Sequence, residues 1–126
     1  MNRMDGKICV VSGATQGLGA AIARRLAATG AAGIVITGRN VERGAAVANE
    51  ITTDLGTPAH FVRADFGSTE DCARVLAETD ATFGRVNVLV NAGAMTDRGT
   101  ILDTTPDLFD RMFATNVRGP FFLMQN

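Results

Sequence analysis

The fold of this chain is decided by a glycine-rich stretch, SGATQGLG, at residues 12–19. A β-branched, apolar run at residues 8–11 precedes it and predicts a strand buried on both faces. After it, Leu18, Ile22 and Leu26 recur every four residues, which predicts a helix packed on a sheet through these side chains. A strand, a glycine turn and a helix in this order aim free backbone N–H groups at a phosphate. The stretch therefore predicts a nucleotide bound at the N-terminus of the first helix.

The composition is that of one soluble globular domain. The chain has 126 residues, of which 46% are hydrophobic, and a net charge of −1. We therefore expect no nucleic-acid partner, and no apolar run is long enough to predict a membrane span. Cys9 falls in a predicted strand and Cys72 in a predicted helix, which indicates buried, reduced thiols in a cytoplasmic protein. No disulfide framework and no metal site are expected.

Strand and helix patterns alternate along the rest of the chain. Further strands are predicted at residues 34–37, 59–62 and 86–90. Asn40, Ser68 and Thr105 are predicted to cap the helices that follow. The side chains expected to be buried on these helices are, in chain order, Val41, Ala45, Ala48, Ile51, Leu55, then Val75, Leu76, Phe83, then Leu108, Met112, Phe113.

Repeated β-α-β units of this length predict an α/β fold of the Rossmann-like, doubly wound kind. The expected sheet is parallel, with about four strands and with helices on both faces. Ligands of such sheets bind beyond the carboxyl ends of the strands, where the strand order reverses. Residues 13–19, Asp65 and residues 91–93 each follow a predicted strand, so we expect them to meet at one edge. The apolar run at residues 119–126 leads us to expect a single domain over 1–126 that is incomplete at its C-terminus.

Arg39 stands at the end of the second predicted strand, twenty positions after Gly19. An acid at this point would accept hydrogen bonds from ribose hydroxyls and repel a 2′-phosphate. The chain instead has Gly38 followed by Arg39, whose guanidinium can pair with phosphate oxygens. This favours NADP(H) over NAD(H), and the alternative is a solvated arginine.

Three other places each allow two interpretations. Asp65 can accept a hydrogen bond from an adenine amino group, or form the turn before Gly67. Residues 91–93 leave room for a ribose against the backbone, or form a simple turn. Asn116 can interrupt the last helix and offer its carbonyl or amide to a water, or face solvent.

In combination, these motifs resemble the short-chain dehydrogenase/reductase family. The likeness is carried by the glycine stretch, Asp65, NAGA at residues 91–94 and NVRG at residues 116–119. It implies a nicotinamide cofactor across the strand ends and hydride transfer between that cofactor and a small-molecule alcohol or carbonyl. It also implies a homo-oligomer for the complete protein.

The resemblance implies a role for each residue of the expected site. The pyrophosphate is expected at Gly13, Gly17, Leu18 and Gly19, the adenine at Asp65 and Phe66, and the ribose at Asn91, Ala92 and Gly93. Thr15, Gln16 and Arg39 complete the expected cofactor contacts. Asn116 matches the asparagine that holds a water in the family's proton relay, and it is the catalytic residue expected within this chain.

The chain departs from the family pattern in its proton-transfer groups. The family uses a serine, a tyrosine and a lysine, and this chain has no tyrosine and only one lysine, Lys7, before the first strand. Such chemistry needs a phenol whose pKa is lowered by a nearby cation. We therefore expect these groups beyond Asn126 and expect the 126-residue chain alone to be inactive.

Two other functions are compatible with parts of this pattern. A non-catalytic dinucleotide-binding module or regulator would keep the phosphate loop and lack the proton-transfer pair. A methyltransferase also has a glycine loop after its first strand, but it needs an acid where Gly38 and Arg39 stand. A P-loop nucleotide triphosphatase is excluded because no lysine follows Gly17 or Gly19.

Overall fold

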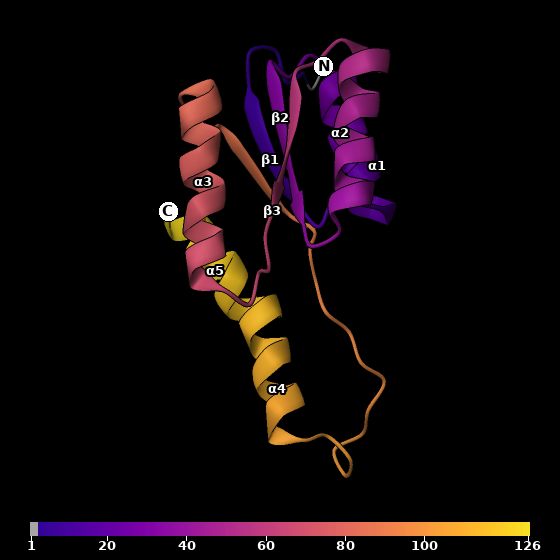
Figure 1. The fold of residues 1–126 in the computed structure, drawn as a ribbon, viewed down its shortest axis with the longest axis vertical. Helices are drawn as coiled ribbons and strands as arrows, with labels where there is room; N and C mark the ends of the chain where they lie inside the picture. The colour runs from indigo at the N-terminus through magenta and orange to yellow at the C-terminus, as the bar shows by residue number, and fades with distance from the viewer. Residues whose placement is uncertain (1–2) are drawn as a thin grey trace.

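Four apolar segments form one parallel sheet in the computed structural model, which describes residues 3–126 (Figure 1). The strands are β1 (Ile8–Ser12), β2 (Gly33–Gly38), β3 (Ala59–Arg63) and β4 (Val88–Asn91). Their order is β3-β2-β1-β4. The strands β2 and β3 are thus added on one side of β1, and β4 then pairs with the other side of β1. The strand order thus reverses between β1 and β4, which confirms the predicted doubly wound, Rossmann-like arrangement.

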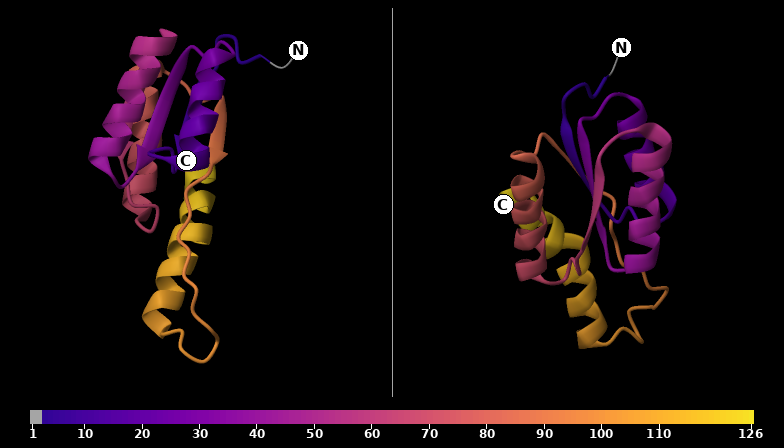
Figure 2. Two further views of the ribbon diagram at one scale, coloured as in Figure 1. Left: turned by 90° about the vertical axis from the view of Figure 1, so that its right-hand side faces the viewer. Right: turned by 45° about the horizontal axis from the view of Figure 1, so that its top comes forward.

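Helices cover both faces of this sheet. On one face lie α1 (Gly17–Ala28) and α2 (Val41–Leu55), and on the other α3 (Thr69–Phe83) and α5 (Gly119–Gln125). One π-helical turn (Ala114–Arg118) joins α5 to α4 (Pro106–Phe113). Figure 2 shows that α4 and the loop before it project beyond the carboxyl ends of the strands. Within residues 3–126, no helix combines the length and the apolar character needed to cross a bilayer.

The predicted helix starts are confirmed by their capping bonds. The side-chain oxygens of Asn40, Ser68 and Thr105 each accept a hydrogen bond from the N–H three residues later, at 2.9, 3.2 and 3.2 Å. Each bond satisfies a backbone donor that the first helical turn leaves free. The predicted strands are found as well, although β4 begins at Val88 rather than at Val86.

The face that α1 turns to the sheet agrees with the prediction only in part. Ala20, Ala23 and Ala27 are buried there, whereas Leu18 is 74% exposed. Small side chains let the helix approach the sheet closely, and a Cβ on Gly19 would collide with the carbonyl of Gly13. Leu18 is therefore left outside the contact, whereas Ile22 and Leu26 are half-buried and pack against the core, as predicted.

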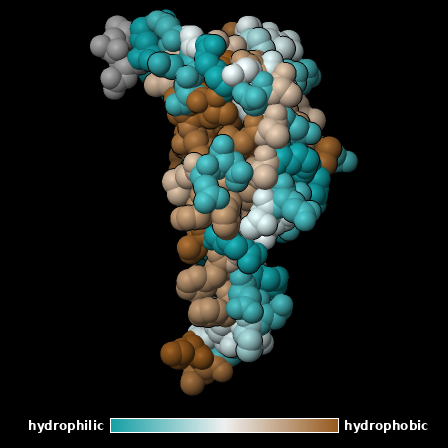
Figure 3. Space-filling model, turned by 90° about the vertical axis from the view of Figure 1, so that its left-hand side faces the viewer, coloured by the Kyte–Doolittle hydropathy of each residue, from teal (hydrophilic) through white to brown (hydrophobic). Residues whose placement is uncertain are grey.

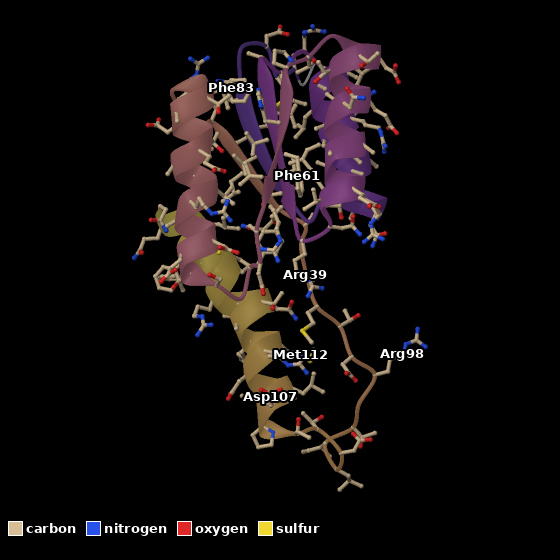
Figure 4. The ribbon with its side chains drawn as sticks, viewed as in Figure 1. Arg39, Phe61, Phe83, Arg98, Asp107 and Met112 are labelled. Atoms are coloured by element: carbon tan, nitrogen blue, oxygen red, sulfur yellow. The ribbon has the colours of Figure 1, made fainter. Side chains whose placement is uncertain are left out.

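The predicted stripe on α2 is also wrong in part, because Val41, Ala45 and Leu55 are exposed. The helix instead turns Gly44 toward β3, where a Cβ would collide with the ring of Phe61. Figure 4 shows the Phe61 side chain between β3 and α2. Gly44 therefore lies on the buried side of α2 together with Ala48 and Ile51, which are buried as predicted.

The predicted burial of α4 is not found. Leu108 and Met112 are half-buried and Phe113 is 53% exposed, because α4 lies beyond the sheet. The rings of Phe109 and Phe113 stack on each other, with centroids 4.6 Å apart.

The core consists of two layers, one on each face of the sheet. Cys9 lies in the layer under α1 and α2, and Cys72 in the layer under α3 and α5. Both side chains are fully buried, as predicted, and burial raises the pKa of both thiols.

Candidate dinucleotide site

A cavity of about 630 Å³ opens at the carboxyl ends of the strands. Its lining comes from the loops after β1, β2, β3 and β4 and from the π-helical turn. The predicted site residues on this lining are Gly13, Thr15, Gln16, Gly17, Leu18, Gly19, Arg39, Asp65, Phe66, Ala92 and Gly93. Asn91 and Asn116 are not on it, although both lie next to residues that are. The strand order thus brings together the loops that the sequence predicted to meet.

The loop after β1 exposes main chain to this cavity. Gln16 is the N-cap of α1, yet its side chain makes no capping bond, so no side chain satisfies the first N–H groups of the helix. Gly17 has a φ of +59°, and a Cβ built there would meet nothing within 4 Å. A bare loop followed by free helical N–H groups fits a diphosphate.

The side chain of Ser12, to which the sequence assigned no role, holds the opposite loop in place. Its hydroxyl oxygen accepts hydrogen bonds from the N–H groups of Ala92 and Gly93, at 3.2 and 3.3 Å. These bonds bring the chain after β4 alongside the loop after β1. The sequence signal was present, because Ser12 is the last residue of β1 and directly precedes Gly13.

The turn after β3 is built around Asp65. One carboxylate oxygen of Asp65 accepts from the Gly67 N–H at 2.9 Å, while the Asp65 N–H donates to Asp71 at 2.9 Å. Asp65 therefore forms the turn and also lines the cavity. The bond from Asp65 N–H holds the pKa of the Asp71 carboxyl below its usual range, and Arg74 at 3.3 Å adds to this effect.

Phe66 fills the space between two glycines. It is 7% exposed, and a Cβ on Gly93 would collide with its ring, whereas a Cβ on Gly119 would collide with its carbonyl oxygen. The turn after β3 is thereby packed between the loop after β4 and the start of α5.

Two arginines give the cavity a positive wall. Arg39 directly follows β2, and Figure 4 shows it at the carboxyl end of the sheet; it shares the cavity lining with Met95 of the loop that leads to α4. Arg43, which the sequence did not indicate, lines the same cavity from the first turn of α2. Among the described lining residues, Asp65 carries a negative charge and the two arginines carry positive charges, so the formal net charge of the lining is positive.

Asn116 lies in the π-helical turn, and both ends of its side-chain amide are hydrogen-bonded. Its oxygen accepts from the Met95 N–H and its NH₂ donates to the Met95 carbonyl, both at 2.7 Å. The helix is interrupted at the place expected, by the π-helical turn, while the Asn116 amide bonds the Met95 backbone; the binding of a water by Asn116 stays a prediction. Pro120, four residues later, has no N–H to donate to the Asn116 carbonyl.

The comparisons with known proteins agree with this architecture. The family model described as short chain dehydrogenase matches residues 7–126. Versicolorin reductase 1 of Aspergillus parasiticus is 38% identical over 122 residues, which are 97% of this chain and 46% of that protein. A probable tetrahydroxynaphthalene reductase of Zymoseptoria tritici is 33% identical over 97% of this chain and 45% of its own length.

Solved structures are similar over nearly the whole chain. L-sorbose reductase of Gluconobacter frateurii, complexed with NADPH and L-sorbose, has a TM-score of 0.93 at 26% identity, over 98% of this chain and 46% of that one. A short chain dehydrogenase of Burkholderia cenocepacia in complex with NADP has a TM-score of 0.93 at 35% identity. The match covers 98% of this chain and 50% of that one. The chain thus spans about half the length of the proteins it matches. By its sequence and by its strand order, it belongs to the short-chain dehydrogenase family of oxidoreductases.

Proposed function

We propose that residues 1–126 form a single dinucleotide-binding unit of a cytoplasmic NADP(H)-dependent oxidoreductase that interconverts an alcohol and a carbonyl. The observation that carries this proposal is one cavity with bare helix N–H groups on one wall and two arginines on another. The NADPH and NADP complexes of the similar reductase and dehydrogenase support it.

The cofactor would be held along the strand ends. Gly13, Gly17 and Gly19 would leave backbone free for the pyrophosphate, and residues 92–93 would face the nicotinamide ribose. Leu18, which is exposed in this structure, would be covered by the bound dinucleotide. When bound, the nicotinamide ring supplies or accepts the hydride.

The adenosine end would be recognised by Asp65, Phe66 and Arg39. Asp65 keeps one carboxylate oxygen for the Gly67 N–H, which leaves the other for an adenine amino group. An acid at position 38 is disfavoured because a Cβ there would lie 2.7 Å from the Thr15 methyl group. Arg39 would then face a 2′-phosphate without a competing carboxylate beside it.

We assign Asn116 two tasks in this reaction. Its amide fixes the loop after β4 through Met95. Its main-chain carbonyl, which has no donor at Pro120, would hold a water in a proton relay. The serine, tyrosine and lysine of that relay would come from another part of the complete protein.

We further propose that the complete protein is a homo-oligomer. Phe113, Val117, Phe121 and Met124 form an exposed stripe along α4, the π-helical turn and α5, each more than half exposed. Figure 3 shows hydrophobic residues on this side of the molecule, from beside the sheet to its lower end. A second copy would cover the stripe. Sedimentation of a Phe121→Ser variant of the complete protein tests this, since an unchanged mass would contradict it.

Titration of the complete protein with NADPH and NADH tests the central proposal. We expect NADPH to bind at least about tenfold more tightly, because a charge-assisted contact to phosphate is lost with NADH. Gly17→Val should abolish both affinities, since valine is strained at positive φ and places a side chain against the pyrophosphate. Absence of heat with either cofactor would contradict the proposal.

A further inference from the structure

We propose that Arg43 is a second anchor for the 2′-phosphate of the cofactor and acts together with Arg39. The inference rests on the proposed function and adds to it a residue that determines cofactor specificity. It assigns the phosphate to a pair of guanidinium groups on either side of the α2 N-cap rather than to one arginine.

The position of Arg43 is set by the cap of α2. The Asn40 side chain accepts the Arg43 N–H at 2.9 Å, which fixes the helix start at Val41. Arg43 thus lies in the first turn of α2, whereas Arg39 precedes the cap. Both arginines line the cavity into which the loop after β1 opens.

The structure provides no protein partner for either charge within residues 3–126. Several other arginines are paired, such as Arg24 with Glu50 at 2.7 Å and Arg111 with Asp107 at 3.2 Å, whereas Arg25 and Arg98, which do not line this cavity, are like Arg39 and Arg43 without such a partner among the described residues. No hydrogen bond or ion pair joins the Arg39 or Arg43 guanidinium to the described protein atoms. A cation in the first turn of a helix also meets the positive end of the helix dipole, which a bound anion would offset further than Glu42 of the same turn does alone.

The chemistry of the ligand calls for two cations. A ribose 2′-phosphate carries between one and two negative charges near neutral pH and presents three outer oxygens. One planar guanidinium binds two of these oxygens at most, and a second can take the third and balance the remaining charge. Asp65 also lines the cavity as an anion, which is a further reason for a second cation beside the phosphate.

The test uses the two adenosine halves of the cofactors, measured by calorimetry on the complete protein. We expect the wild type to bind 2′,5′-ADP more tightly than 5′-AMP. Arg43→Ala should lower the affinity for 2′,5′-ADP about tenfold and leave that for 5′-AMP unchanged within about twofold. Arg43→Lys should restore part of the lost affinity for 2′,5′-ADP, since lysine keeps the positive charge but lacks the paired N–H donors of the guanidinium. Alanine is a good helix former at this exposed position, and circular dichroism will confirm that the variants are folded.

Arg25→Ala is the matched control, because Arg25 is an exposed arginine on α1 that does not line this cavity. It should change neither affinity. The inference is overturned if Arg43→Ala leaves the preference for 2′,5′-ADP intact, or if it weakens both ligands equally and so acts through the helix start. If the wild type itself binds neither ligand or prefers neither, the proposed function fails and the inference falls with it.

Discussion

Gly13 and Gly93 meet backbone to backbone at the carboxyl ends of β1 and β4, so closely that a Cβ on Gly13 would collide with the Gly93 main chain. The contact lies at the point where the strand order reverses. The Ser12 hydroxyl reinforces it through its bonds to the N–H groups of Ala92 and Gly93. One glycine pair therefore sets the distance between the proposed pyrophosphate and ribose sites.

Replacing Gly13 with alanine should destabilise the complete protein by about 3 kcal/mol and abolish dinucleotide binding. Gly13 has a φ of +68°, so alanine suffers backbone strain in addition to the collision. Urea denaturation measures the loss. Gly84→Ala is the control, because Gly84 has a φ of +80° but nothing lies within 4 Å of its Cβ position. Gly84→Ala should lower the free energy of unfolding by only about 1 kcal/mol. Equal losses in the two variants would contradict the collision between position 13 and the Gly93 backbone.

Replacing Asn116 with alanine should cost about 2 kcal/mol, because the Met95 N–H and carbonyl both lose their partner. Asn116→Asp should be worse, since a carboxylate oxygen would then face the Met95 carbonyl. Thermal unfolding of the wild type and of both variants measures their relative stability. The amide pairing is contradicted if the aspartate variant proves the more stable.

Acid should loosen the turn after β3 through Asp71. Its pKa is lowered in the folded state, so its contribution is present above the unfolded-state value of about 4 and is lost as pH falls through the folded value. At neutral pH we expect Asp71→Asn to be less stable by about 1 kcal/mol. The difference should shrink below about pH 4. Denaturation curves recorded over that range check this, and a difference independent of pH would count against it.

Cofactor preference should respond to the pair of Gly38 and Thr15. Gly38→Asp alone should weaken both cofactors, because a side chain at position 38 collides with the Thr15 methyl group. Adding Thr15→Ser removes that methyl group and should recover NADH binding, but NADPH binding should stay at least about tenfold weaker. The affinities come from fluorescence titration. Recovery of NADPH binding in the double variant would contradict the proposed place of the phosphate.

Much of the fold could be predicted because its signals are local. The continuous β-branched runs of β1 and β2 and the caps at Asn40 and Ser68 act within a few residues of themselves. The side that each helix turns to the sheet could not be predicted, because it depends on the residues of other elements that the helix packs against. On α1 the alanines pack closely and Leu18 is left outside, and on α2 the ring of Phe61 requires Gly44.

The candidate site was predictable where a motif follows a strand and was missed where tertiary contacts create it. Met95 and Thr115 enter the lining because the π-helical turn lies against the loop after β4. Arg43 enters because a helix brings it back over the cavity that Arg39 borders. No short-range pattern marks these three residues.

The π-helical turn also changes the direction in which everything after it points. An α-helix advances by about 100° per residue, so one extra residue rotates α5 by about that angle relative to α4. With this rotation Leu123 enters the core beside Val75, whereas Phe109 on α4 remains outside. Deleting a single residue between Ala114 and Arg118 would restore an even pitch and swing Leu123 out of the interior. The π-helical turn therefore allows α4 and α5, which are continuous in the chain, to turn their apolar sides in different directions.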